Sequence, residues 1–105
     1  MATFIVLGHF TEQGIRTVRD TTTRADGVRE MGRKFGVQVK DIYWTIGEYD
    51  VVTIAEAPDA ATATAFCLAI GQAGNVRTEM LPAFNRDEMK TILARVATAR
   101  EAVPA

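Results

Sequence analysis

Two kinds of hydrophobic pattern follow one another along the chain and predict strands and helices in turn. Short runs rich in β-branched and aromatic residues predict strands over residues 3–10, 37–46, 50–57 and 76–81. Between and after them, apolar residues recur at the three- and four-residue spacing of a helix face. The three apolar stripes are Ala25, Val28, Met31 and Phe35; Ala63, Phe66, Cys67 and Ile70; and Met89, Ile92, Leu93 and Val96.

Polar residues and glycines mark where these helices begin and end. Thr11 is a suitable N-cap for a short helical turn, and Asp59 caps the helix that follows the third strand. Gly36 stands where a left-handed C-terminal cap is needed. Asn85 and Glu88 have the spacing of a capping box before the last helix.

The resulting order is β-α-β-β-α-β followed by one helix, which is the ferredoxin-like arrangement of an α+β fold with an antiparallel sheet. A chain of 105 residues is long enough for one modest core. We therefore expect a single domain over residues 1–105, with its core over 3–84 and an added C-terminal helix over 86–100. The tail 101–105 is expected to fray.

The hairpin between the second and third strands sets the register of the sheet. With Glu48 at the tip of the hairpin, Trp44 pairs with Val52 and Ile42 pairs with Ile54, which gathers the large apolar groups on one face. A shift of one residue would bring Trp44 beside Val51 and mix the two faces. We expect the first register, because it directs the larger side chains toward the helices.

The face of the sheet opposite the helices has a mixed character. Tyr43, Thr45, Val51, Thr53, Ala55, Arg77, Glu79 and Leu81 are expected on it, with alternate residues of the first strand. A surface this apolar suits a partner sheet with a small wet cavity in between. We expect a homodimer joined sheet to sheet, like the dimeric α+β barrel proteins, and a last helix that docks at a subunit edge and supports assembly beyond a dimer.

Composition and charge narrow the classes of function. The formal net charge is −1 and the twelve basic residues are interleaved with acids, which argues against nucleic-acid binding. One cysteine and one histidine make neither an intrachain disulfide nor a zinc site, and no glycine-rich phosphate loop occurs. No basic leader and no run of about 20 apolar residues is present. The expectation is a soluble, cytoplasmic protein without membrane association, cofactor or metal.

Six residues could line a ligand site on the mixed face. His9 ends the first strand beside the start of the last, so Arg77 should lie close to it. One reading gives His9 the role of a general base and Arg77 that of an anion anchor; the other makes His9 a strand-end residue and pairs Arg77 with Glu79 at a subunit boundary. Either reading leaves His9 and Arg77 on the same face of the sheet.

The turn and the neighbouring strand supply the remaining candidates. Tyr49 and Asp50 form an acid–base pair in one reading and stabilise the turn in the other, in which Gly47 supplies an unusual backbone angle. Tyr43 is expected to converge on the same face from the second strand. The structural reading of the turn is the one we favour.

Five segments, in order, resemble those of one known family. Phe10-Thr11-Glu12-Gln13-Gly14-Ile15 follows the first strand, and Tyr43, Gly47, Tyr49, Asp50 and Val52 form the hairpin core. Further matches are Glu56-Ala57-Pro58-Asp59, Gly74-Asn75-Val76-Arg77-Thr78 and Ala83-Phe84. Together they resemble the GYD domain family, named for its Gly-x-Tyr-Asp arrangement. The resemblance implies a small α+β domain with no known cofactor and no established catalytic set.

Two classes of function stay open on these grounds. The first is a self-associating module that binds a small molecule between its sheets. The alternative is a cofactor-independent enzyme, an isomerase or oxygenase acting on small cyclic or anionic metabolites, by analogy of architecture. A third, haem binding through His9, has a single candidate ligand behind it. The sequence favours the first, because it gathers no concentrated catalytic set.

Overall fold

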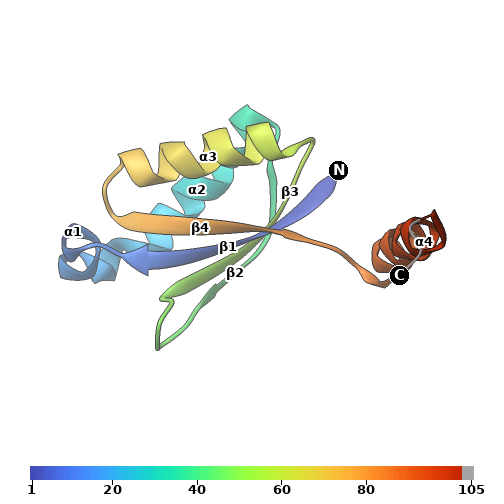
Figure 1. The fold of residues 1–105 in the computed structure, drawn as a ribbon. Helices are drawn as coiled ribbons and strands as arrows, with labels where there is room; N and C mark the ends of the chain where they lie inside the picture. The colour runs from blue at the N-terminus through green and yellow to red at the C-terminus, as the bar shows by residue number, and fades with distance from the viewer. Residues whose placement is uncertain (103–105) are drawn as a thin grey trace.

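The computed structural model describes residues 1–102 and has four strands and four helices (Figure 1). Residues 103–105, and with them most of the tail expected to fray, lie outside the described residues. In chain order the elements are β1 (Ala2–Phe10), α1 (Glu12–Arg16), a 3-10 turn (Val18–Asp20), α2 (Thr21–Phe35), β2 (Gln38–Trp44), β3 (Val51–Ala57), α3 (Ala60–Gln72), β4 (Val76–Ala83) and α4 (Arg86–Ala102).

The four strands form one antiparallel sheet in the order β2-β3-β1-β4. Both long crossover helices, α2 and α3, cover the same face of this sheet (Figure 1). We call the covered side the helix face and the other the open face. This is the ferredoxin-like α+β arrangement that the sequence predicts, with α4 added after β4.

The predicted helix boundaries are confirmed by their hydrogen bonds. The Thr11 side chain accepts from the Gly14 amide, and Asp59 accepts from the amide of Thr62 at 2.8 Å. Protonation of Asp59 would weaken that cap, and the same bonds hold the pKa of its carboxyl below the ordinary value. Gly36 adopts φ 80° after α2, the left-handed C-terminal cap expected there.

Helix α1 packs closely against the turn before β4. Thr11 donates its amide to Asn75 O at 3.0 Å and its hydroxyl to Gly74 O at 2.6 Å. Gln13 Nε2 donates to Asn75 Oδ1 at 3.0 Å. A Cβ built on Gly14 would stand only 2.0 Å from Asn75 O. This position therefore accepts only glycine, because the two backbones meet where a side chain would be.

The expected hairpin register is wrong by one residue. Trp44 pairs with Val51 and Tyr43 pairs with Val52, and the ladder shifts again between Val39 and Asp41, where Lys40 forms a bulge. The bulge lets Val39 point to the core while Tyr43 faces the other way, so neither face of β2 follows a simple alternation.

The correction also reassigns the faces of β3. Val51, Thr53 and Ala55 lie on the helix face, where the smaller of these residues leave room for α2 and α3. Val52 and Ile54 lie on the open face instead. Our expectation failed because it assigned the large side chains to the helices, whereas close helix packing on β3 requires small ones.

The open face is consequently more apolar than predicted. Strand register places its residues in cross-sheet rows. The two central rows are Tyr43, Val52, Leu7 and Glu79, and Asp41, Ile54, Ile5 and Leu81. No helix of residues 1–102 covers this face (Figure 1). Tyr43 and Leu81 keep 57% and 45% of their surface exposed, so a broad apolar area is left bare in a single chain.

The core is concentrated on the helix face at one end of the sheet. Phe66 of α3 is the largest fully buried side chain, and it lies in one cluster with Phe4, Val37, Ala55 and Ala57. Toward the other end of the sheet, near Phe10 and Trp44, the helix face is filled less completely.

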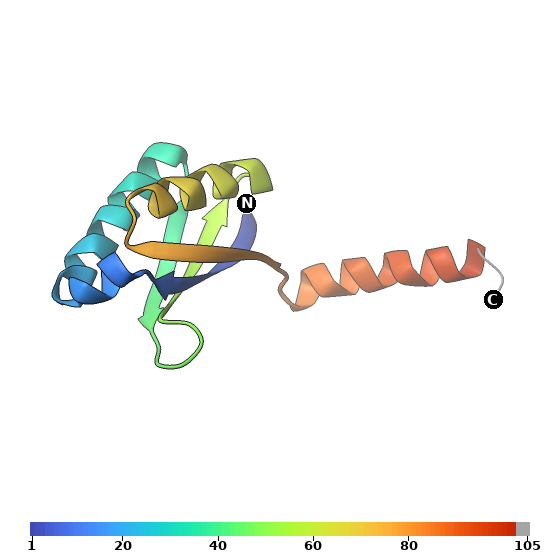
Figure 2. The ribbon, with the colours of Figure 1, turned by 60° about the vertical axis from the view of Figure 1, so that its left-hand side comes forward.

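The last helix does not fold back on the body of the chain. Figure 2 shows α4 projecting away from the sheet and from the other helices. The radius of gyration is 16.8 Å, against roughly 13 Å for a compact chain of about this length. Met89, Leu93 and Val96 of its apolar stripe keep 43%, 53% and 58% of their surface exposed. The capping box at its start is present as predicted, with Asn85 and Glu88 exchanging bonds of 2.8 and 2.9 Å.

Candidate functional site

The Gly-x-Tyr-Asp segment forms the loop between β2 and β3. Gly47 has φ 142°, a conformation that favours glycine, and a Cβ there would meet nothing within 4 Å. The Thr45 amide donates to Asp50 O at 2.8 Å and closes the loop at its base. Gly47 is therefore required by the backbone angle and not by crowding.

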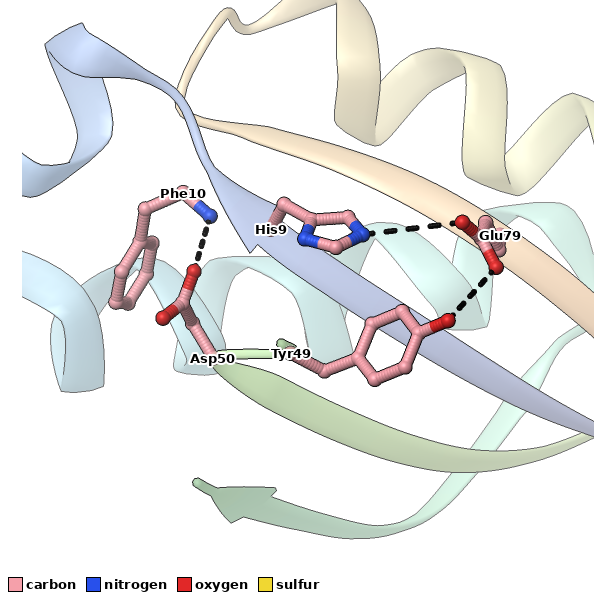
Figure 3. Close-up of polar contacts among 5 residues, drawn as sticks. All are labelled: His9, Phe10, Tyr49, Asp50 and Glu79. Atoms are coloured by element: carbon pink, nitrogen blue, oxygen red, sulfur yellow. Dashed lines mark hydrogen bonds and ion pairs between the residues drawn. The ribbon is translucent and has the colours of Figure 1, made fainter. Parts of the chain in front are cut away.

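Asp50 ties this loop to the end of β1. Its Oδ2 accepts from the Phe10 amide at 2.8 Å (Figure 3). Its own amide donates to Gly8 O at 2.8 Å. The β1–β3 ladder ends in register at Gly8 and Val51. The carboxylate thus satisfies a strand amide beyond the last regular pair, which favours the structural reading of Asp50.

Replacing Asp50 by alanine should destabilise the fold. The Phe10 amide would lose its acceptor in a half-buried position, which costs about 1–3 kcal/mol of unfolding free energy. Urea denaturation followed by tryptophan fluorescence would measure the change. Asp50→Asn, which keeps an oxygen acceptor, should recover part of the loss. An Asp50→Ala variant as stable as the parent chain would show that the bond contributes nothing.

The Tyr49 side chain extends from the same loop into a polar cluster on the open face. Its hydroxyl donates to Glu79 Oε2 at 3.2 Å, and its ring lies against His9 with the centroids 4.8 Å apart (Figure 3). His9 Nε2 stands 3.8 Å from Glu79 Oε1. We call His9, Tyr49 and Glu79 the open-face cluster.

The electrostatics of this cluster favour a protonated phenol. Partial removal of Tyr49 from water raises the pKa of its phenol above the ordinary value. The hydrogen bond to Glu79 is the second cause of this rise. At neutral pH Tyr49 is therefore a hydrogen-bond donor and not a base. Glu79 accepts from it and faces His9, so the cluster can hold a ligand through its imidazole and carboxylate while Tyr49 orients the carboxylate.

The other two predicted site residues lie apart from this cluster. Arg77 is the cross-strand partner of His9, as the strand order predicts, but it lines a groove between β4 and α3 together with Thr78 and Cys67. Among the described side chains, Glu79 contacts His9 and Tyr49 and no ion pair joins it to Arg77. Tyr43 lies in the same cross-sheet row as Glu79, separated from it by two strands.

Two observations concern other chemistry. Burial raises the pKa of the Cys67 thiol, which disfavours the reactive thiolate. Among the side chains that the structure describes, those of residues 1–99, no three metal-ligating groups gather at one place. In that same part of the chain, no helix has the length and apolar character needed to cross a bilayer.

Comparison with known proteins identifies the family. The GYD domain model matches residues 4–93. The chain belongs to the GYD domain family. A relative from Thermus thermophilus, named glutamine synthetase and cystathionine beta-lyase binding protein, is 40% identical over 84 residues, which cover 79% of this chain and 88% of the relative. No solved structure matches the chain.

The geometry gives the GYD motif a physical meaning in this chain. Gly47 permits the loop conformation, Asp50 extends the β1–β3 ladder, and Tyr49 crosses to Glu79 of β4. Thr11 and Gly14, which also resemble family positions, fasten α1 to the turn before β4. The motif therefore stabilises one end of the sheet and, through Tyr49, orders the polar end of the open face.

Proposed function

We propose that this GYD domain is a small binding module that associates with itself through the open face of its sheet. The observation that carries the proposal is the uncovered pair of apolar rows on that face. Ile5, Leu7, Val52 and Ile54 are only partly buried, and they shield one another without any covering element. A contiguous apolar surface of this kind is typical of an interaction site.

The area of this face indicates that the sheet alone is too small to form a stable interface. Four strands spaced about 4.8 Å apart and about 23 Å long present roughly 450 Å², whereas a stable interface buries about 800 Å² on each partner. The helix α4 is about 25 Å long, and Met89, Leu93 and Val96 of its apolar stripe are also exposed. We propose that α4 packs on a neighbouring copy and supplies the remaining contact.

The polar groups that border the face support a specific, two-fold pairing of sheets. The open-face cluster lies at one end, and an ion pair of 3.4 Å between Lys40 and Glu56 lies toward the other. Polar borders around an apolar centre are the usual anatomy of a protein interface. In this arrangement the open-face cluster would contact the space between the sheets, where it could bind a small polar molecule.

A second partner is proposed from the comparison. The relative from Thermus thermophilus carries a name that describes it as binding two enzymes. We propose that this chain likewise binds a larger protein, and that the hairpin tip contributes, since Ile46 there is fully exposed. The enzyme alternative receives less support, because His9 keeps about a third of its side chain exposed and no enclosing wall surrounds it among the described residues.

A charge placed on the open face tests the proposal. Leu81→Asp should convert the assembly to a monomer, because it buries an unpaired carboxylate at the contact. Leu68→Asp is the matched control, since Leu68 is also an exposed leucine, 69% exposed, but lies on α3 away from the open face. Sedimentation velocity at micromolar concentration would measure the mass. A parent chain that sediments as a monomer would refute the proposed association.

A further inference from the structure

An apolar cleft lies on the helix face, on the opposite side of the sheet from the open-face cluster. It has a volume of about 70 Å³. Val6, Gly8 and Val51 of the sheet form its floor, Trp44 stands on one side, and Ala25 and Val28 of α2 lie above it. A site of this volume could admit several water molecules, since one needs about 10–15 Å³ on a comparable measure.

A small residue of α2 explains why the cleft is left open. Ala25 is the residue that α2 directs over it, and its methyl group is too short to fill the space beneath. A Cβ on Gly8 would approach Val51 Cγ1 to 2.6 Å and Val76 Cγ1 to 2.8 Å, so the two valines already occupy that space and form a floor of methyl groups. The tightly packed cluster around Phe66 lies toward the other end of the sheet.

The nitrogen donors at the cleft are already engaged, and its other polar side chains are threonine hydroxyls. Trp44 Nε1 donates to Thr21 Oγ1 at 3.0 Å. Arg24 donates to the carbonyls of Thr17 and Gly14 at 2.8 and 3.2 Å. A charged or strongly polar ligand would therefore lose its hydration without compensation, whereas an apolar ligand would gain from burial.

We propose that this cleft binds a small neutral apolar molecule of about the size of a single aromatic ring. Trp44 keeps 42% of its surface exposed, and its indole offers a flat apolar wall against which such a ring can pack. A second cleft of about 230 Å³ between α2 and α3 shares Val28 and Ile70 with the first, so the two clefts are neighbours.

Toluene is a suitable probe, because Trp44 is the only tryptophan and reports directly on the site. Toluene should change the fluorescence of Trp44 in a saturable way and raise the melting temperature, since it binds only the folded chain. Benzoate, which has the same ring and a negative charge, should do neither at equal concentration. Absence of both responses to toluene up to its solubility limit would overturn the proposal.

Two filling variants locate the binding. Ala25→Leu fills the cleft from α2 and Thr53→Ile fills it from β3, so each should abolish both responses to toluene. Ala61→Leu adds the same bulk as Ala25→Leu at an exposed position of α3 and should leave the responses unchanged. A response that persists in a folded filling variant would place toluene elsewhere and refute the assignment. The cleft is on the helix face, whereas the proposed self-association uses the open face. The toluene experiments therefore test the cleft alone, and sedimentation tests the self-association.

Discussion

Gly14→Ala should lower the unfolding free energy by about 3 kcal/mol or more, a severe effect for the addition of one methyl group. The new Cβ would stand 2.0 Å from the Asn75 carbonyl oxygen, far inside van der Waals contact. Relief requires α1 to move away from the turn before β4. That movement would break the bonds of Thr11 to Gly74 and Asn75.

A second glycine gives a matched control for this result. Gly27 lies inside α2, and a Cβ there would meet nothing within 4 Å. Gly27→Ala should raise the unfolding free energy by about 0.4–1 kcal/mol, because alanine loses less backbone freedom on folding. Urea denaturation of both variants against the parent chain measures the contrast. Equal stability of Gly14→Ala and the parent would show that α1 does not dock as closely as described.

Removal of residues 85–105 should reduce the number of copies in the assembly. The stripe of α4 has no partner within its own chain among the described residues, so its burial must come from a neighbour if it contributes to association. Size-exclusion chromatography with light scattering would give the mass. The truncated chain should keep its helix-face core and its melting transition, because α4 projects away from both.

Point variants separate this role of α4 from a general effect of truncation. Leu93→Lys places a charge in the apolar stripe, whereas Thr91→Lys places the same charge on the opposite side of the helix. We expect Leu93→Lys to lower the mass of the assembly and Thr91→Lys to leave it unchanged. An unaltered mass for the truncated chain and for Leu93→Lys would exclude α4 from the interface.

The sequence predicted the order of elements well because local signals define it. The caps at Thr11, Asp59 and Asn85 and the glycine at 36 all act as expected. Periodicity could not give the hairpin register. The bulge at Lys40 and the helix packing over β3 decide it, and both depend on contacts between segments distant in sequence.

The sequence named the residues of the candidate site, but it did not give the contacts between them. Strand order correctly brought His9 beside Arg77 in register. The contact of Tyr49 with Glu79 was not foreseen, because it depends on how the Tyr49 side chain reaches over β1 to β4. The apolar cleft was missed altogether, since it results from the small size of Ala25 above strands that meet α2 only in the folded chain.

The irregular outer strands have a consequence for how far association can proceed. β2 and β4 are the edges of the sheet, and the bulge at Lys40 interrupts one while Pro82 removes an amide donor from the other. Neither edge offers an unbroken row of backbone groups on which another strand could extend the ladder. Growth of the folded chain by strand addition is thereby disfavoured.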